Sequence, residues 1–155
     1  MTRIARAARP TIFAALCCVF NVQAGELPAG LQKSLKAFST VSVTMEDGAL
    51  KINMRKPVVS RRDVYRLIVK MGACYPLWND PKNGWGSASI ARIEVKNDIG
   101  AQGFAFNGGR KECAALGKSE NTDAEDRYID AHTWVCVAGN ACRPRRPGEQ
   151  VAGDE

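Results

Sequence analysis

Four cysteines constrain the fold of this 155-residue chain more than any other sequence feature: Cys74, Cys113, Cys136 and Cys142. They are 39, 23 and 6 residues apart, and none belongs to the C-x2-C pair that is typical of zinc sites or thioredoxin-type redox sites. The other two cysteines, Cys17 and Cys18, lie in an N-terminal segment that is expected to be removed on export. An even number of remaining cysteines in an exported chain indicates disulfides. We therefore expect two disulfide bonds that staple the domain, no metal and no cofactor.

The four cysteines allow three pairings. Cys136 and Cys142 enclose VAGNA, a segment expected to turn back on itself, so a local bridge is geometrically easy. Cys74 follows one predicted helix and Cys113 lies in another, and both helices are expected on the same sheet. We prefer Cys74–Cys113 with Cys136–Cys142. The nested pairing, Cys113–Cys136 with Cys74–Cys142, stays open as the alternative.

Residues 1–24 have the three parts of a cleavable signal peptide. Three arginines and no acidic residue come first, an apolar run follows, and Ala24 precedes the expected cleavage point. Lipoprotein processing is disfavoured because Leu16, rather than a small residue, precedes Cys17. The apolar run is too short for a permanent membrane anchor. We expect a protein exported to the periplasm or secreted, with no membrane span.

Removal of residues 1–24 lowers the formal net charge from +6 to +3, because it takes away three arginines and no acidic residue. So mild a charge does not favour nucleic acid as a partner, and the only short basic cluster is residues 143–146. Residues 25–142 are expected to form a single globular domain. Residues 143–155 offer little to bury, which predicts a disordered tail.

Apolar periodicity predicts the secondary structure. Strands are expected at residues 40–45, 50–54, 90–95, 103–106 and 133–137, and helices at residues 27–38, 61–71 and 111–116. Asp47-Gly48 between the first two strands predicts a β-hairpin with a tight turn. This order predicts an α+β fold, a small antiparallel sheet with two or three helices packed on one face.

The helix expected at residues 61–71 begins at Ser60, a typical N-cap, and ends at Gly72. Its spacing points one apolar set toward the core, Val64, Leu67, Ile68 and Met71. Basic side chains fall on its other side: Arg61, Arg62, Arg66 and Lys70. These basic residues either form a solvent-exposed helix face or bind an anionic partner. The acidic segment at residues 119–126 is expected to be a mobile loop.

Three aromatic residues lie in or beside the Pro- and Gly-rich segment at residues 75–86: Tyr75, Trp78 and Trp85. Exposed aromatic rings carry much of the energy of protein contacts, so these residues are candidates for a binding surface. In the alternative interpretation, Trp78 folds under the loop and Trp85 packs against the next strand, and both belong to the core.

A catalytic site has weaker support. His132 is the only histidine, and the nucleophile-elbow pattern G-x-S-x-G is absent. Glu94 as base, His132 as acid, and Arg92 and Arg127 as phosphate ligands would suit a secreted ribonuclease-like hydrolase if folding brought them together. The first hypothesis is therefore a small exported, non-enzymatic binding protein (an inhibitor, immunity-type or accessory factor) that acts on another protein. The hydrolase is the alternative.

Overall fold

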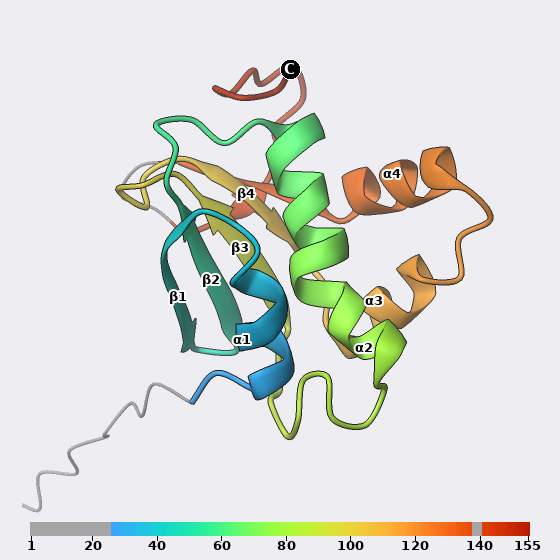
Figure 1. Cartoon of the computed structure of the whole chain (residues 1–155). Coiled ribbons are helices and arrows are strands. Elements are labelled where there is room, and N and C mark those ends of the chain that lie inside the picture. The colour runs from blue at the N-terminus through green and yellow to red at the C-terminus, as the bar shows by residue number, and fades with distance from the viewer. Residues whose placement is uncertain (1–25, 138–140) are drawn as a thin grey trace, which may run out of the picture.

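The computed structural model describes residues 26–137 and 141–155 (Figure 1), so the predicted signal peptide lies outside the described residues. The predicted hairpin is confirmed: β1 (Thr40–Glu46) pairs with β2 (Ala49–Met54) in antiparallel fashion. Asp47 and Gly48 both have positive φ angles, 51° and 70°. These angles are typical of the two-residue type I′ turn, whose twist matches that of the strands.

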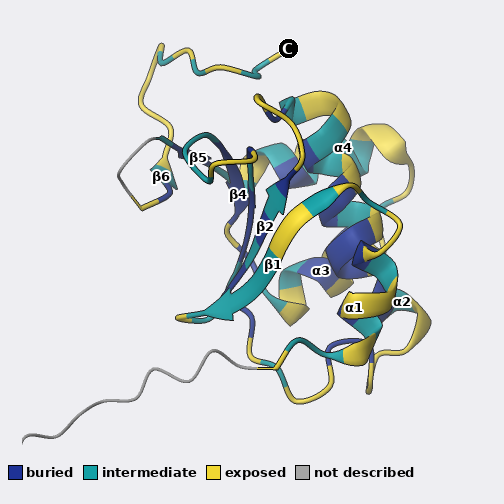
Figure 2. Ribbon diagram, turned by 60° about the vertical axis from the view of Figure 1, so that its left-hand side comes forward, coloured by how far each residue is buried: buried dark blue, intermediate teal, exposed yellow. Residues whose placement is uncertain are grey.

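Six strands form one sheet in sequence order, β1 to β6. The remaining strands are β3 (Arg92–Lys96), β4 (Gly103–Phe106), β5 (Thr133–Cys136) and β6 (Arg143–Pro144). All neighbours are antiparallel except β2 and β3, which are parallel because a helical crossover returns the chain before β3 begins. The helices lie on one side of the sheet (Figure 2), so the expected α+β architecture is confirmed.

The helices differ from the prediction in number and length. α1 (Ala29–Leu35) and α3 (Arg110–Leu116) match expected helices. The helix after Ser60 continues without a break through η1 (Arg61–Tyr65), η2 (Ile68–Cys74) and α2 (Tyr75–Asn79). We call residues 61–79 the crossover helix. The Ser60 side chain caps it by accepting a hydrogen bond from the Asp63 N–H, as expected.

Gly72 does not end the crossover helix, so that prediction is wrong. Its role is close packing: a Cβ at this position would lie 2.8 Å from Leu35 of α1. The Ser34 hydroxyl also donates to the Gly72 carbonyl at 2.6 Å. A glycine inside a helix costs about 1 kcal/mol relative to alanine, and here it allows α1 to approach the crossover helix closely.

The acidic segment forms a helix, which the sequence did not predict. α4 spans Thr122–Ala131 and includes residues 122–126 of the expected mobile loop. Asn121 caps it through its side-chain oxygen, which accepts from the Ala124 N–H at 2.9 Å. Asp123 and Glu125 in the first turn are favourable near the positive end of the helix dipole. The mobile-loop prediction is therefore wrong for these residues.

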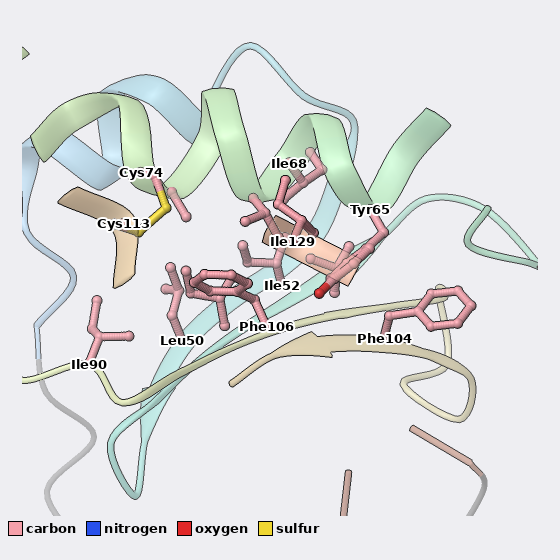
Figure 3. Close-up of a cluster of buried hydrophobic side chains, with 14 of the residues drawn as sticks. Leu50, Ile52, Tyr65, Ile68, Cys74, Ile90, Phe104, Phe106, Cys113 and Ile129 are labelled. Atoms are coloured by element: carbon pink, nitrogen blue, oxygen red, sulfur yellow. A yellow bond between two sulfur atoms is a disulfide. The ribbon is translucent and has the colours of Figure 1, made fainter. Parts of the chain in front are cut away.

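The core lies between the sheet and the helices (Figure 3). It contains Leu50 and Ile52 of β2, Phe104 and Phe106 of β4, and side chains of the crossover helix and α4. Both preferred disulfides are present. Cys74–Cys113 joins the crossover helix to α3 inside the core, and Cys136–Cys142 links the end of β5 to the residue before β6.

The buried face of the crossover helix is not the predicted one. A second apolar set with the same spacing is buried instead: Tyr65, Ile68, Val69 and Gly72. Tyr65 explains this choice, because its ring packs on Phe104 at 5.5 Å and its hydroxyl lies 3.0 Å from the Thr133 hydroxyl. Only Ile68 belongs to both sets. As a result, Leu67 and Met71 face the outside of the molecule.

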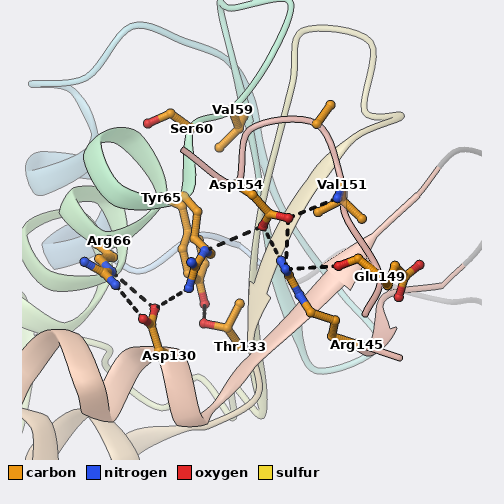
Figure 4. A network of polar contacts seen from close by, with 12 residues as sticks. Val59, Ser60, Tyr65, Arg66, Asp130, Thr133, Arg145, Glu149, Val151 and Asp154 are labelled. Atoms are coloured by element: carbon orange, nitrogen blue, oxygen red, sulfur yellow. Dashed lines mark hydrogen bonds and ion pairs between the residues drawn. The ribbon is translucent and has the colours of Figure 1, made fainter. Parts of the chain in front are cut away.

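The C-terminal segment, for which the sequence predicted disorder, lies against the domain (Figure 4). β6 pairs with β5, and the Arg61 N–H donates to the Gly153 carbonyl at 2.7 Å. The side chain of Gln102 donates to the Ala152 carbonyl at 2.5 Å, and Asp154 forms ion pairs with Arg61 and Arg145. Arg61 and Gln102 are distant from these residues in the sequence, which is why local composition did not indicate this docking.

Candidate functional site

An apolar ridge runs along the outer side of the crossover helix. Leu67, Met71 and Tyr75 are 48%, 39% and 41% exposed and follow one another at intervals of four residues, so they lie in a row on a helix surface. We call these three residues the helical ridge. Among the described residues, the other large exposed apolar side chains are single ones on β1 and two loops, Val41, Val58 and Ile99. The ridge is therefore the longest exposed apolar row on a described helix.

An open groove of about 750 Å³ lies beside the ridge. One wall comes from α1 and the residues after it, including Lys33 and Phe38, and the other wall includes Met71 and Tyr75 of the ridge. Asp80, Asn83 and Gly84 of the following loop also line the groove. The ridge and the groove together form a candidate contact surface with an apolar centre and a few polar groups, a composition that is usual for binding sites.

Close packing and hydrogen bonds build the walls of this groove. A Cβ on Gly30 of α1 would lie 2.3 Å from the Gly84 carbonyl, so helix and loop touch directly. Asp80 holds the loop, because its carboxylate accepts from the Asn83 N–H at 3.0 Å and from the Lys82 N–H at 3.2 Å. These hydrogen bonds, that from Asn83 first, lower the pKa of Asp80. The groove is thus preformed.

The structure separates the three candidate aromatic residues. Trp85 is fully buried, and its indole N–H donates to the Ala73 carbonyl at 2.7 Å. Trp78 is half-buried, and its N–H donates to the Cys113 carbonyl at 2.7 Å. Tyr75 lies edge-on to Trp78, with 6.3 Å between ring centroids, and lines the groove. Tyr75 therefore belongs to the candidate contact surface, and Trp85 to the core.

The basic stripe of the crossover helix faces an anionic element of the same chain. Arg66 forms hydrogen bonds with Asp130 and Asp126 of α4, and Lys70 lies 2.6 Å from Glu125. Arg61 pairs with Asp130 at 3.1 Å. These three cations hold α4 against the crossover helix, whereas Arg62 is exposed. The solvated-face interpretation therefore fails for three of the four basic residues.

The proposed catalytic residues are not brought together. Glu94 pairs with Ala105 across β3 and β4, while the adjacent pair, Ile93 and Phe106, lies in the core on the helix side. Alternate residues of a strand point to opposite faces, so Glu94 lies on the face away from the helices. His132 lies on the helix side, 5.6 Å from the Phe106 ring.

Neighbouring groups already engage both residues. The Glu94 carboxylate is buried and lies 2.7 Å from the Lys96 ammonium and 2.8 Å from the Arg92 guanidinium. Burial opposes ionisation, but the hydrogen bonds from Lys96 and Arg92 outweigh it and lower the pKa of Glu94. His132 stacks on Tyr128, and its Nδ1 lies 2.8 Å from the Tyr128 carbonyl. Arg127 is exposed on α4.

Comparisons with protein families, curated proteins and solved structures found no match for this chain. No helix within the described ranges combines the length and the hydrophobicity that a membrane crossing requires. In the same residues, no three His, Cys, Asp or Glu side chains are grouped so that they could hold a metal ion.

Sequence reasoning assigned Leu67 and Met71 to the core and so missed the ridge. A signal was present, because residues 64–71 contain more apolar side chains than one helix face can bury: Val64, Leu67, Ile68, Val69 and Met71. Such a surplus indicates a second apolar contact.

Proposed function

We propose that this protein is an exported binding protein without catalytic activity, an inhibitor, immunity-type or accessory factor that recognises a protein partner through the helical ridge and its groove. The observation that carries the proposal is the row of Leu67, Met71 and Tyr75 beside a preformed apolar groove. Contiguous exposed apolar surface is unusual in a monomeric domain and marks interaction sites.

The chemistry of the surface suits an amphipathic helix of the partner. An apolar helix face docks into a groove through side chains at intervals of three and four residues, and the ridge presents its own side chains at the same interval. Full burial of a Leu or Met side chain contributes roughly 1.5–3 kcal/mol, so completing the burial of half-exposed side chains contributes about half of that each. Three such contacts with a preformed groove support specific binding.

Export is part of the proposal. Residues 1–24 have the pattern of a signal peptide, and the two disulfides are typical of proteins outside the cytosol. N-terminal sequencing of protein recovered from the periplasm or the medium should begin at Gly25. An intact Met1 on the disulfide-bonded protein would contradict export.

Site-specific crosslinking in the producing cell tests the contact surface. We expect a photo-reactive phenylalanine analogue at Met71 or Tyr75 to capture the same single protein. The matched control is the analogue at Val58, which is 46% exposed but lies away from the ridge, and it should not capture that protein.

Leu67→Asp should abolish capture from position 71 and leave the thermal midpoint unchanged, because Leu67 is half exposed. Equal capture from position 58, or capture that survives Leu67→Asp, would refute the assignment of the ridge. The hydrolase receives no support from the geometry, because Glu94 and His132 lie on opposite faces of the sheet.

A further inference from the structure

The outer edge of β1 has no neighbouring strand among the described residues, because β1 ends the strand order of the sheet. Figure 2 shows part of β1 as exposed at this edge, and Val41 is 50% exposed. An edge strand with free N–H and C=O groups is a template for pairing with another strand.

The hairpin geometry determines which backbone groups are free. Glu46 and Ala49 flank a two-residue turn and therefore form a hydrogen-bonded pair. Such pairs alternate along an antiparallel ladder, so Thr44 and Ser42 also bond inward to β2. Val43 and Met45 then direct their N–H and C=O groups outward, away from the sheet.

β1 lacks the features that protect natural edges. It contains no proline and no lysine, and its only charged residue is Glu46 at the end. Its one irregularity, between Thr40 and Ser42, lies at the other end. The opposite edge differs, because β6 has only two residues and one of them is Pro144. Among the described strands, β1 therefore offers the only free edge of useful length.

We propose that β1 pairs antiparallel with β1 of a second copy of this chain, with the two-fold axis at Thr44. In this register Val43 lies opposite Met45 of the second copy, and these are the residues with outward backbone groups. Both pairs of this kind exchange N–H···O bonds. Glu46 lies opposite Ser42 of the second copy, so the only charged residue of the strand meets a hydroxyl and not a like charge.

Pairing of β1 with β1 of a second copy stops at the dimer. A two-fold contact uses the same edge on both copies, and in the described part of the chain only the short β6 edges then stay free. The product is a closed dimer and not a fibre. The two halves of the sheet become one continuous sheet, and the half-buried side chains of Val43 and Met45 gain neighbours from the second copy.

Charge variants at Thr44 test this register. Thr44 is half-buried. It lies opposite Thr44 of the second copy only if the two-fold axis passes through this position. Thr44→Lys and Thr44→Glu should each weaken dimerisation roughly two- to fivefold, because like charges then lie directly opposite each other. An equimolar mixture of the two variants should dimerise at least as tightly as the unmodified chain. Thr44→Gln, which is uncharged, should dimerise normally.

The measurement is sedimentation equilibrium on the mature chain over a concentration series, with circular dichroism to confirm that each variant is folded. A monomeric unmodified chain up to its solubility limit would overturn the proposal. A dimer that is insensitive to both charges, or weakened variants that the mixture does not rescue, would overturn it as well.

Cysteine crosslinking gives a second readout. Residues opposite each other in a non-hydrogen-bonded pair have Cα atoms about 4.5 Å apart, within the range for a disulfide. Thr44→Cys should form a covalent dimer under mild oxidation. Ser42→Cys is the control, because the two copies of Ser42 would be separated by four strand positions, about 13 Å. Equal crosslinking of both variants would contradict the register. Neither experiment involves the ridge, so the outcome is independent of the proposed function.

Discussion

Arg66 of the crossover helix holds Asp130 of α4 with a two-pronged contact, from Nε to one carboxylate oxygen at 3.2 Å and from Nη2 to the other at 2.5 Å. The Arg66 side chain is only 15% exposed, so solvent screens the contact weakly. Fork-shaped pairs of this kind combine charge with a fixed geometry. They attach the acidic helix, which has little apolar surface of its own, to the rest of the domain.

Replacement of Arg66 should therefore destabilise the protein. We expect Arg66→Met to lower the free energy of unfolding by about 1–2 kcal/mol, because Asp130 loses two charged hydrogen bonds but keeps partial access to water. Arg66→Lys should recover only part of this loss, since an ammonium cannot form the fork. Urea titrations measure the free energy of unfolding of both variants. Equal stabilities of Arg66→Lys and the unmodified protein would show that charge alone matters.

The two disulfides should differ in their contribution to stability. Cys74–Cys113 closes a loop of 39 residues and Cys136–Cys142 one of 6. Loop-closure entropy predicts losses of about 4 and about 2 kcal/mol when each pair is replaced by alanine. Thermal or urea unfolding of the two double variants tests the order. A larger loss for the short loop would mean that strain or packing, and not chain entropy, dominates.

The tail should loosen in acid. The hydrogen bond from Arg143, and next that from the Arg146 N–H, lower the pKa of Glu149 from 4.5 to about 2. A carboxyl group whose pKa is lower in the folded state stabilises that state above its unfolded pKa, and the contribution is lost as the pH falls. We expect docking to weaken between pH 4.5 and about 2. Amide NMR signals of Val151 can follow this change. Glu149→Gln should show a smaller change over the same range.

Trp85 and Tyr75 should differ in their roles: we expect Trp85 to contribute to stability and Tyr75 to binding. Trp85→Ala should lower the free energy of unfolding by about 3–5 kcal/mol, because it leaves a cavity where a fully buried ring stood. Tyr75→Ala should change stability much less, since 41% of that residue is exposed, and should instead weaken binding of the partner. Chemical unfolding together with the crosslinking yield distinguishes the two. A large loss of stability in Tyr75→Ala would place this ring in the core.

Features that depend on a few neighbouring residues were predictable. The hairpin follows from alternating apolar residues around Asp47-Gly48, and the start of the crossover helix follows from Ser60. The disulfide pairing followed from one local loop and two helices on one sheet face. The hairpin and the helix cap depend on contacts between residues that are close in the sequence. The disulfide pairing was predictable because four cysteines allow only three pairings.

Features that depend on distant partners were not predictable from local patterns. The buried face of the crossover helix is decided by Tyr65 and Phe104, and helix formation in the acidic segment is supported by Arg66 and Lys70. The tail docks on Arg61 and Gln102, more than forty residues earlier. The candidate contact surface also depends on these distant partners. The ridge residues are exposed because the crossover helix buries the face that contains Tyr65.

The parallel pairing of β2 with β3 has a consequence for oxidative folding. Cys74 lies within the crossover between these strands, and Cys113 lies beyond β4, so native oxidation of this pair requires the central strands to be aligned first. The Cys136–Cys142 ring requires only a short local turn. We therefore expect the small ring to oxidise early during folding of the reduced chain, while the Cys74 thiol stays free until the sheet has assembled around it.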